Sequence, residues 1–186
     1  MLQDIQNGHS NIKIIKQKHI GQHPALFEGF KVAKGEIIIT MDADQNAGPQ
    51  YIPGLLDKLN QGYDIVVSWR VSRLGLGLIR RFGSLLVNRY TNFITGTRLH
   101  DHACSLKVFR GQLVKENLHR KELRRFFGIF IARYTNRISE IKALSNYKYS
   151  KNSSFTFKGL LLLLFDFIFS SINMRYRNIL SRIGRP

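Results

Sequence analysis

Two aspartates separated by one residue, Asp42 and Asp44, directly follow the apolar run EIIITM at residues 36–41. Carboxylates at this spacing in a loop can turn toward one point and hold a hard divalent cation, Mg²⁺ or Mn²⁺, through oxygen. Such a cation would neutralise a diphosphate and stabilise it as a leaving group. The alternative is a solvated turn in which an Asp caps the next helix. The position at the end of a strand, where open α/β sheets bind ligands, favours the metal site.

Strand and helix patterns alternate around the two aspartates. Residues 11–15 and 36–41 are short apolar runs, and apolar residues recur at helical spacing over 24–33 between them. The β-branched run at 36–41 is typical of a central strand that is buried on both faces. Strand, helix, strand in this order predicts a βαβ unit within a mostly parallel sheet flanked by helices.

The same reasoning extends this pattern along the middle of the chain. The further predicted elements are a helix at 51–60, a strand at 64–69, a basic and partly helical region at 71–98, a strand at 104–109 and a helix at 113–123. The sequence shows no internal repeat and no low-complexity linker. The fold class is therefore α/β.

Residues 155–172 form an aromatic and apolar segment that is too short, and too interrupted by Asp166, to span a bilayer. Four arginines follow it: Arg175, Arg177, Arg182 and Arg185. This combination predicts an amphipathic helix that lies in the membrane interface with a basic rim. The alternative is a core helix of the globular domain. We divide the chain accordingly into a domain at 1–154 and a basic, amphipathic membrane-interface segment at 155–186.

The net charge of +17 is concentrated in the second half of the 186-residue chain. Residues 102–186 carry 17 basic and 4 acidic side chains, whereas residues 1–101 carry 12 basic and 8 acidic ones. Such an excess favours an anionic partner, which could be nucleic acid, an anionic membrane or a phosphorylated substrate, and the alternative is a solvated basic surface without such a partner. No zinc finger, RNA-binding signature or helix-turn-helix pattern is visible, which argues against nucleic acid. The single cysteine, Cys104, excludes an internal disulfide and makes the cytoplasmic side the default compartment.

The stretch at 21–53, GQHPALFEGFKVAKGEIIITMDADQNAGPQYIP, resembles the core of family 2 glycosyltransferases. It is most similar to dolichyl-phosphate mannose synthases and bacterial undecaprenyl-phosphate glycosyltransferases, which carry Gly-Gln-x-x-Ala-x-x-x-Gly, a strand ending in Asp-Ala-Asp, and Pro-x-x-Ile-Pro. Further matches are 62–66 with Arg70, 95–96, 99–101, 104–110, 122–126 and 139–141. The resemblance covers about residues 11–155 and implies a partial GT-A (Rossmann-like) fold.

The resemblance implies a role for each residue of the aspartate loop. Asp42 and Asp44 would be ligands of the metal and of the nucleotide-sugar, with Asp44 the more direct metal ligand and part of the catalytic centre. The family usually has Leu-Gln after the pair, and its Gln also reaches the metal. Here Asn46 takes that position with a shorter amide, so the implied metal ligands are Asp42, Asp44 and Asn46.

The remaining implied site residues are all charged. Arg70 would contact phosphate through its planar guanidinium, and Asp101 would lie near the transferred sugar or the acceptor phosphate, both as catalytic residues. Arg124 and Arg125 would lie close to the lipid phosphate, and Lys148 would help to clamp the diphosphate. Other interpretations are a surface salt bridge for Arg70, a loop Asp bonded to its own backbone for Asp101, and headgroup contacts for the arginine pair.

The function that the resemblance implies is transfer of a sugar from a nucleotide-sugar to a polyprenyl phosphate, undecaprenyl or dolichyl, for envelope glycan synthesis. We expect a single, inverting displacement at the cytoplasmic face of the membrane, with the protein bound peripherally to anionic lipid. The family's opening strands, which hold base and ribose, have no counterpart here. We therefore expect weak activity and an exposed sheet edge that invites oligomers. The alternatives are a non-catalytic membrane-surface remnant of such an enzyme and a basic nucleic-acid-binding protein.

Overall fold

A four-stranded sheet forms the centre of the computed structural model, which describes residues 11–16, 21–43, 47–71, 78–144, 162 and 164–172. The strands are β1 (Ile37–Thr40), β2 (Ile65–Arg70), β3 (Lys107–Arg110) and β4 (Ile138–Ala143), in the spatial order β1-β3-β2-β4. β3 is antiparallel to both β1 and β2, whereas β2 and β4 are parallel. Three strands thus run in one direction, which confirms the mostly parallel α/β sheet.

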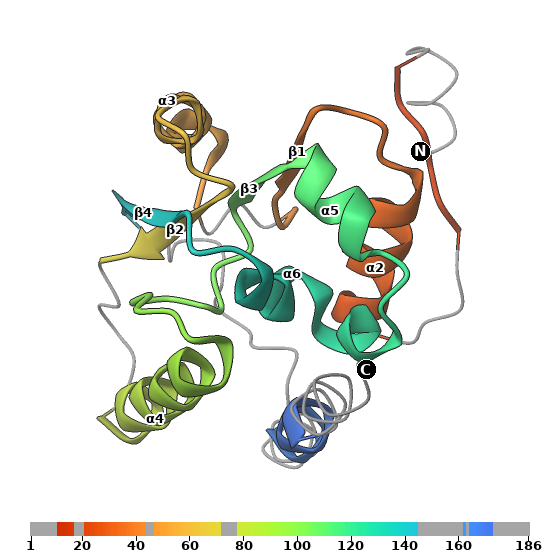
Figure 1. Cartoon of the computed structure of the whole chain (residues 1–186). Helices are drawn as coiled ribbons and strands as arrows, with labels where there is room; N and C mark the ends of the chain where they lie inside the picture. Colours follow the sequence, from red (N-terminus) through yellow and green to blue (C-terminus); the bar gives the residue numbers. More distant parts are fainter. Residues whose placement is uncertain are drawn as a thin grey trace, which may run out of the picture.

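Helices cover both faces of this sheet (Figure 1). The α-helices are α2 (Gln22–Val32), α3 (Ile52–Asn60), α4 (Leu78–Thr95), α5 (Gly111–Asn117) and α6 (Phe127–Phe130), and the 3-10 turns are η1 (Pro49–Tyr51), η2 (Lys121–Phe126) and η3 (Ile131–Tyr134). α3 packs on one face against β2, β3 and β4. α2 and α6 contact each other on the opposite face, beside η2. This layering matches the expected sheet flanked by helices.

Phenylalanines fill the core between the sheet and the α2–α6 layer. The Phe30 ring lies 5.5 Å from that of Phe109 on β3 and 5.0 Å from that of Phe127 on α6. All three side chains are buried, and aromatic pairs in such tilted or edge-on arrangements add to the burial energy. This packing holds α2, and the residues at its amino end, against the sheet.

The structure corrects three expectations from the sequence. Residues 11–16 are described without a strand, because an apolar run becomes a strand only with a partner to pair with. The predicted helix at 113–123 is divided between α5 and η2, with a turn between them. Among the described strands, β1 lies at an edge instead of the centre, and Ile39 is 39% exposed. A β-branched run therefore did not require burial on both faces here.

Residues 164–172 form a helix that rests on the globular part by one face, the blue helix of Figure 1. Phe167 is buried, with its ring 5.0 Å from Phe126 and 5.4 Å from Phe130. The Ser171 hydroxyl is 2.6 Å from the hydroxyl of Tyr90 on α4. Within the described residues, no helix is both long and apolar enough to cross a membrane. The proposed boundary at 154/155 lies outside the described residues.

Candidate functional site

The segments that carry the predicted site residues meet at one end of the sheet, beyond the carboxyl ends of β1 and β2. Thr40 at the end of β1 and Val67 on β2 both pair with Lys107, the first residue of β3. The loop after β1, the end of β2 and the loop before β3 therefore lie side by side. These segments bring Asp42, Arg70 and Asp101 to the same end, as expected for ligands beyond the carboxyl ends of strands.

Asp42 is half-buried and is held by the start of α2. Its Oδ1 accepts a hydrogen bond of 2.7 Å from Gln22 Nε2, and its backbone N–H lies 3.3 Å from Ser105 Oγ. The Gly-Gln motif before α2 thus supplies a side chain that orients the first aspartate. Asp44 and Asn46 lie outside the described residues, so of the three predicted metal ligands the structure places only Asp42.

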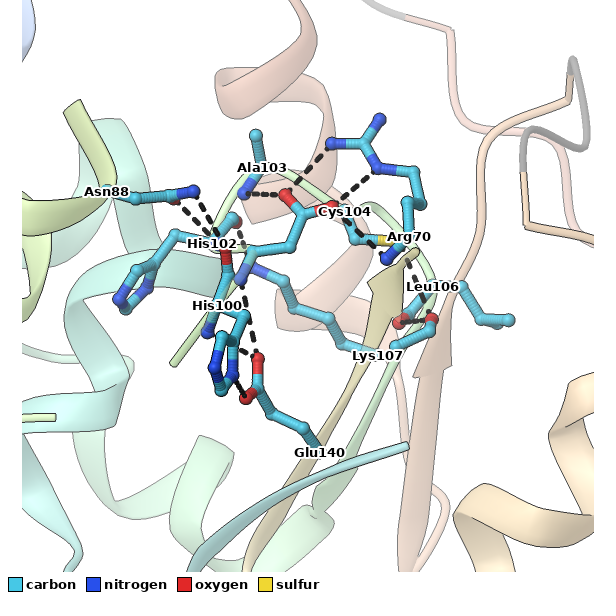
Figure 2. Close-up of polar contacts among 11 residues, drawn as sticks. Arg70, Asn88, His100, His102, Ala103, Cys104, Leu106, Lys107 and Glu140 are labelled. Carbon is cyan, nitrogen blue, oxygen red and sulfur yellow. Dashed lines mark hydrogen bonds and ion pairs between the residues drawn. The ribbon is translucent and has the colours of Figure 1, made fainter. Parts of the chain in front are cut away.

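Arg70 and Asp101 form a bidentate ion pair, and the Arg70 guanidinium with its dashed contacts lies in the upper right part of Figure 2. Arg70 Nε and Nη2 donate to the two Asp101 carboxylate oxygens at 2.6 and 3.0 Å. The Asp101 side chain is 0% exposed, and that of Arg70 is 21% exposed. The Ala103 N–H also donates to Asp101 Oδ1, at 3.2 Å. Arg70 does form a salt bridge, and Asp101 does bond to the backbone of its own loop, as the alternative interpretations had it. The carboxylate of this pair is nevertheless buried rather than at the surface. Asp101 therefore fixes the direction of the Arg70 guanidinium.

Glu140 on β4 holds the loop that presents Asp101. Its Oε1 accepts from the His100 N–H at 2.7 Å, and its Oε2 lies 2.8 Å from His100 Nδ1. The imidazole of His100 also stacks on Trp69, with the ring centroids 4.0 Å apart and the planes 15° from parallel. Figure 2 shows the contact between His100 and Glu140 below the ion pair. β4 therefore anchors the loop, a contribution that the sequence prediction of elements had not included.

Lys107 is a fully buried cation that the sequence analysis did not single out. Its Nζ donates to the backbone carbonyls of His102, at 2.9 Å, and Gly128 on α6, at 3.1 Å. Burial lowers the pKa of Lys107 to about 8, although the nearby Cys104 thiol and Asp101 carboxylate act in the opposite direction. The sequence did offer one indication of this buried lysine, since Lys107 lies within the mostly apolar run at 104–109.

Two histidines lie around this cation, His102 buried and His23 half-buried. His23 near the start of α2 packs on Phe126, with ring centroids 4.6 Å apart, and burial lowers its pKa to about 4. His102 Nε2 lies 2.8 Å from Asn92 Oδ1, and burial lowers its pKa to about 3. The charge of Lys107 lowers the pKa of both imidazoles further. Both histidines are therefore neutral at neutral pH, and the positive charges here are those of lysine and arginine.

The predicted acceptor-side arginines lie on η2, beside α2 and α6. The Arg124 guanidinium lies over the Phe27 ring, 5.5 Å from its centroid. Arg125 Nε is 2.5 Å from Asp166 Oδ2 on the helix at 164–172. Both arginines are exposed, as a contact with either a lipid phosphate or a headgroup requires. Lys148 lies outside the described residues.

A separate hollow of about 840 Å³ lies at the opposite end of β2. Its lining includes Asp64 and Arg137, which pair with each other at 2.8 Å. It also includes Arg110, whose guanidinium is 2.7 Å from the Leu59 carbonyl oxygen. Its size alone would make it a candidate binding site. None of the residues that the sequence analysis assigned to the site lines this hollow, so the cluster of Asp42, Arg70 and Asp101 is the better candidate.

Comparison with known proteins defines the family. The model for glycosyl transferase family 2 matches residues 1–118, and the chain belongs to this family. The undecaprenyl-phosphate 4-deoxy-4-formamido-L-arabinose transferase of Pseudomonas aeruginosa is 32% identical over 163 residues, which cover 88% of this chain and 48% of the relative. The protein of the same name from Shewanella sediminis is 33% identical over 173 residues, which cover 93% of this chain and 52% of the relative.

The chain spans about half the length of the curated relatives it matches. Among solved structures, it is similar to glucosyl-3-phosphoglycerate synthase from Mycobacterium tuberculosis in complex with Mn²⁺ and uridine-diphosphate-glucose. That similarity has a TM-score of 0.46 at 15% identity, and covers 97% of this chain and 59% of the other.

Proposed function

We propose that this chain forms a glycosyltransferase domain that moves a sugar from a nucleotide-sugar to undecaprenyl phosphate or another polyprenyl phosphate. The observation that carries the proposal is the convergence of Asp42 with the Arg70–Asp101 pair at one end of the sheet. Family membership and relatives named as undecaprenyl-phosphate sugar transferases support it. The donor would bind at this end, and the acceptor phosphate would approach from the side of Arg124 and Arg125.

The reaction that we propose needs little acid–base chemistry from the protein. A phosphate monoester is already anionic near neutral pH, so its oxygen can attack the anomeric carbon without a strong base. The bond from that carbon to the donor diphosphate breaks as the new bond forms. The protein's part is to hold the two substrates in line and to stabilise the departing diphosphate.

In this scheme Arg70 grips the donor phosphates, and Asp101 positions Arg70. A guanidinium is suited to phosphate because its N–H groups lie in one plane and can bind two oxygens at once. The buried carboxylate of Asp101 accepts from Nε and Nη2 and so limits the rotation of the arginine side chain. The family resemblance implied that Asp101 lies near the transferred sugar or the acceptor phosphate. We propose instead that Asp101 acts indirectly, by holding the Arg70 side chain in position.

Asp42 fits a hard divalent cation, Mg²⁺ or Mn²⁺, through its carboxylate oxygens. The described residues hold no group of three or more His, Cys, Asp or Glu side chains that could bind a metal by themselves. We propose that Asp44 and Asn46 would complete the ligand set with Asp42. When bound, the cation would neutralise the diphosphate and favour its departure. Gln22 would keep the Asp42 carboxylate turned toward this position.

Replacing Asp42 by asparagine should lower sugar transfer by about a hundredfold, because the cation that neutralises the diphosphate loses a negatively charged ligand. It should also weaken Mn²⁺ binding, which electron paramagnetic resonance of the free ion measures without any turnover. Asp57→Asn provides the control, since Asp57 is exposed on α3. Equal Mn²⁺ binding by the two variants would contradict the role of Asp42 as a ligand.

The direct test of the function is transfer of radiolabelled sugar to polyprenyl phosphate in detergent, with Mn²⁺ present. The expected product is a lipid-linked sugar whose formation requires both donor and acceptor. Arg70→Gln should reduce this transfer by roughly 10²–10³, the usual effect of removing one preorganised group that stabilises developing charge. If Arg70→Gln transfers as fast as the unaltered chain, the site lies elsewhere.

We further propose that the protein binds peripherally to the cytoplasmic face of an anionic membrane. Two helices that lie near each other in Figure 1, α4 and the C-terminal helix, touch through Tyr90 and Ser171, and each exposes apolar side chains. We call these side chains the apolar platform: Leu85, Leu86 and Phe93 on α4, and Leu162, Phe165, Phe169 and Ile172 on the C-terminal helix. The basic excess of the second half of the chain, 17 basic against 4 acidic residues, supports attraction to anionic headgroups. One face of the helix at 164–172 packs on the domain and the other is exposed, which supports an interfacial position for the exposed face.

Replacing Phe165 and Phe169 together by serine should weaken binding to phosphatidylglycerol-containing liposomes by at least about tenfold. Each ring is exposed by more than two thirds, at 68% and 67%, and burying it in lipid contributes on the order of 1.5 kcal/mol or more. Ile39→Ser is the matched control, because Ile39 is also exposed but lies on β1. Liposome flotation with added salt separates the apolar contribution from the ionic one. Undiminished binding by the double variant would exclude the platform.

A further inference from the structure

Asp166 occupies an unusual position in the C-terminal helix. It is the one acidic residue in the aromatic and apolar segment at 155–172. Its Oδ2 lies 2.5 Å from Arg125 Nε, and the Asp166 side chain is 26% exposed. A carboxylate in an apolar segment lowers its affinity for lipid, so its presence requires another reason. The ion pair with Arg125 is the contact that the structure provides.

The packing of the helix determines where this carboxylate lies. Phe167 is 6% exposed and packs against the rings of Phe126 and Phe130. Phe126 directly follows Arg125 in the chain, so the two neighbouring residues of η2 contact two neighbouring residues of the helix. Phe167 therefore anchors the helix, while Asp166 places a negative charge at the guanidinium.

We propose that Asp166 stands in for the acceptor phosphate at Arg125, so that the Asp166 carboxylate acts as a latch that the acceptor displaces. This inference rests on the proposed function, which assigns Arg125 to the phosphate of the lipid. Without acceptor, the carboxylate of Asp166 neutralises the guanidinium. With acceptor, the phosphate takes its place and the carboxylate turns away to solvent.

The strengths of the two contacts make this exchange feasible. The Arg125 side chain is 57% exposed, and ion pairs at such positions are weak. A phosphate monoester carries between one and two negative charges near neutral pH and three acceptor oxygens, so it competes well with a single carboxylate. Phe167 keeps its own contacts during the exchange, so the helix need not leave the domain.

The latch lies next to the donor end of the site. His23 packs on Phe126, and its pKa is affected by the charges of both Asp166 and Arg125. The residue before it, Gln22, holds the Asp42 carboxylate. A change of occupant at Arg125 thus takes place beside the segment that orients the proposed donor ligand.

The test measures binding of dimethylallyl phosphate, a soluble prenyl phosphate, to the full chain by titration calorimetry. Asp166→Asn should bind this probe roughly two- to fivefold more tightly than the unaltered chain, because the competing exposed pair is gone. Asp57→Asn controls for the loss of one negative charge, and dimethylallyl alcohol controls for the apolar tail. Arg125→Gln should bind weakly, and adding Asp166→Asn to it should give no further gain.

Unchanged or weaker binding by Asp166→Asn would overturn the latch, as would a gain that persists in the Arg125→Gln background. Failure of the probe to bind either the unaltered chain or Asp166→Asn would overturn it as well. The transfer assay separates this inference from the proposed function. Transfer to polyprenyl phosphate without the binding gain leaves the function and removes the latch. The gain without any transfer leaves an anion site gated by Asp166 and removes the function.

Discussion

Asp101→Ala is expected to lower the free energy of unfolding by about 3 kcal/mol. The substitution removes a carboxylate that is 0% exposed and accepts two hydrogen bonds from the Arg70 guanidinium. Removing one partner of a buried ion pair typically costs about 3–5 kcal/mol, because the other charge stays in a medium of low dielectric constant. The lower end of this range applies here, because the Arg70 side chain is 21% exposed and water can hydrate its charge once Asp101 is removed.

Urea denaturation of matched variants measures this effect. Glu28→Gln is the control, because Glu28 pairs with Lys31 at 2.7 Å on the exposed surface of α2, where such pairs contribute at most about 1 kcal/mol. Transfer rates test the positioning role. If Asp101 acts through Arg70, the double variant with Arg70→Gln should transfer no more slowly than Arg70→Gln alone. Additive losses, or a loss of stability no larger than that of Glu28→Gln, would contradict this assignment.

The elements around the site were predictable where periodicity and length agreed. Apolar residues at helical spacing predicted α2 and α3, and the apolar run at 64–69 predicted β2. The position of Asp42 after β1 also followed from the order of the elements. Sequence patterns succeed here because each segment has one face to bury and ends at a glycine or a polar loop.

Pairing between strands was not predictable in the same way. A β-branched run has the same pattern at the centre of a sheet as at its edge, so β1 was placed wrongly. The Arg70–Asp101 pair joins residues 31 positions apart in the chain, and no local spacing encodes such a contact. The family resemblance named both residues as groups that contact the substrates, and the structure adds that they bind each other.

Lys107 and His102 were missed because a single sequence does not distinguish a buried polar residue from an exposed one. Lys107 lies within the run at 104–109, and lysines are almost always exposed in folded proteins. In the structure its ammonium group is buried between the carbonyls of His102 and Gly128. It links the loop that presents Asp101 to α6, which directly follows η2 and its acceptor-side arginines. The Lys107 ammonium group is thus placed to fix the loop of Asp101, at the proposed donor side, relative to the arginines at the proposed acceptor side.

The lowered pKa values of two histidines predict that the fold is labile in acid. His102 and His23 have pKa values lowered from 6.5 to about 3 and about 4, mainly by burial. Between pH 6.5 and these values, the unfolded chain binds more protons at both sites than the folded chain does. The free energy of unfolding therefore falls as the pH decreases through this window, and it is regained above pH 6.5.

The expected loss is on the order of 3 kcal/mol for His102 by the time the pH reaches about 4, since each pKa unit corresponds to 1.36 kcal/mol. His23 adds a smaller amount, because solvent reaches part of its ring. The free energy of unfolding, measured in urea at a series of pH values, should show this decline. His102→Gln keeps an amide that can donate to Asn92 but does not titrate, so its decline should be shallower by the His102 share. His119→Gln on an exposed histidine is the control. Equal slopes for the two variants would mean that His102 is protonated in the folded state, and the loop carrying Asp101 would then have to accommodate a second buried cation beside Lys107.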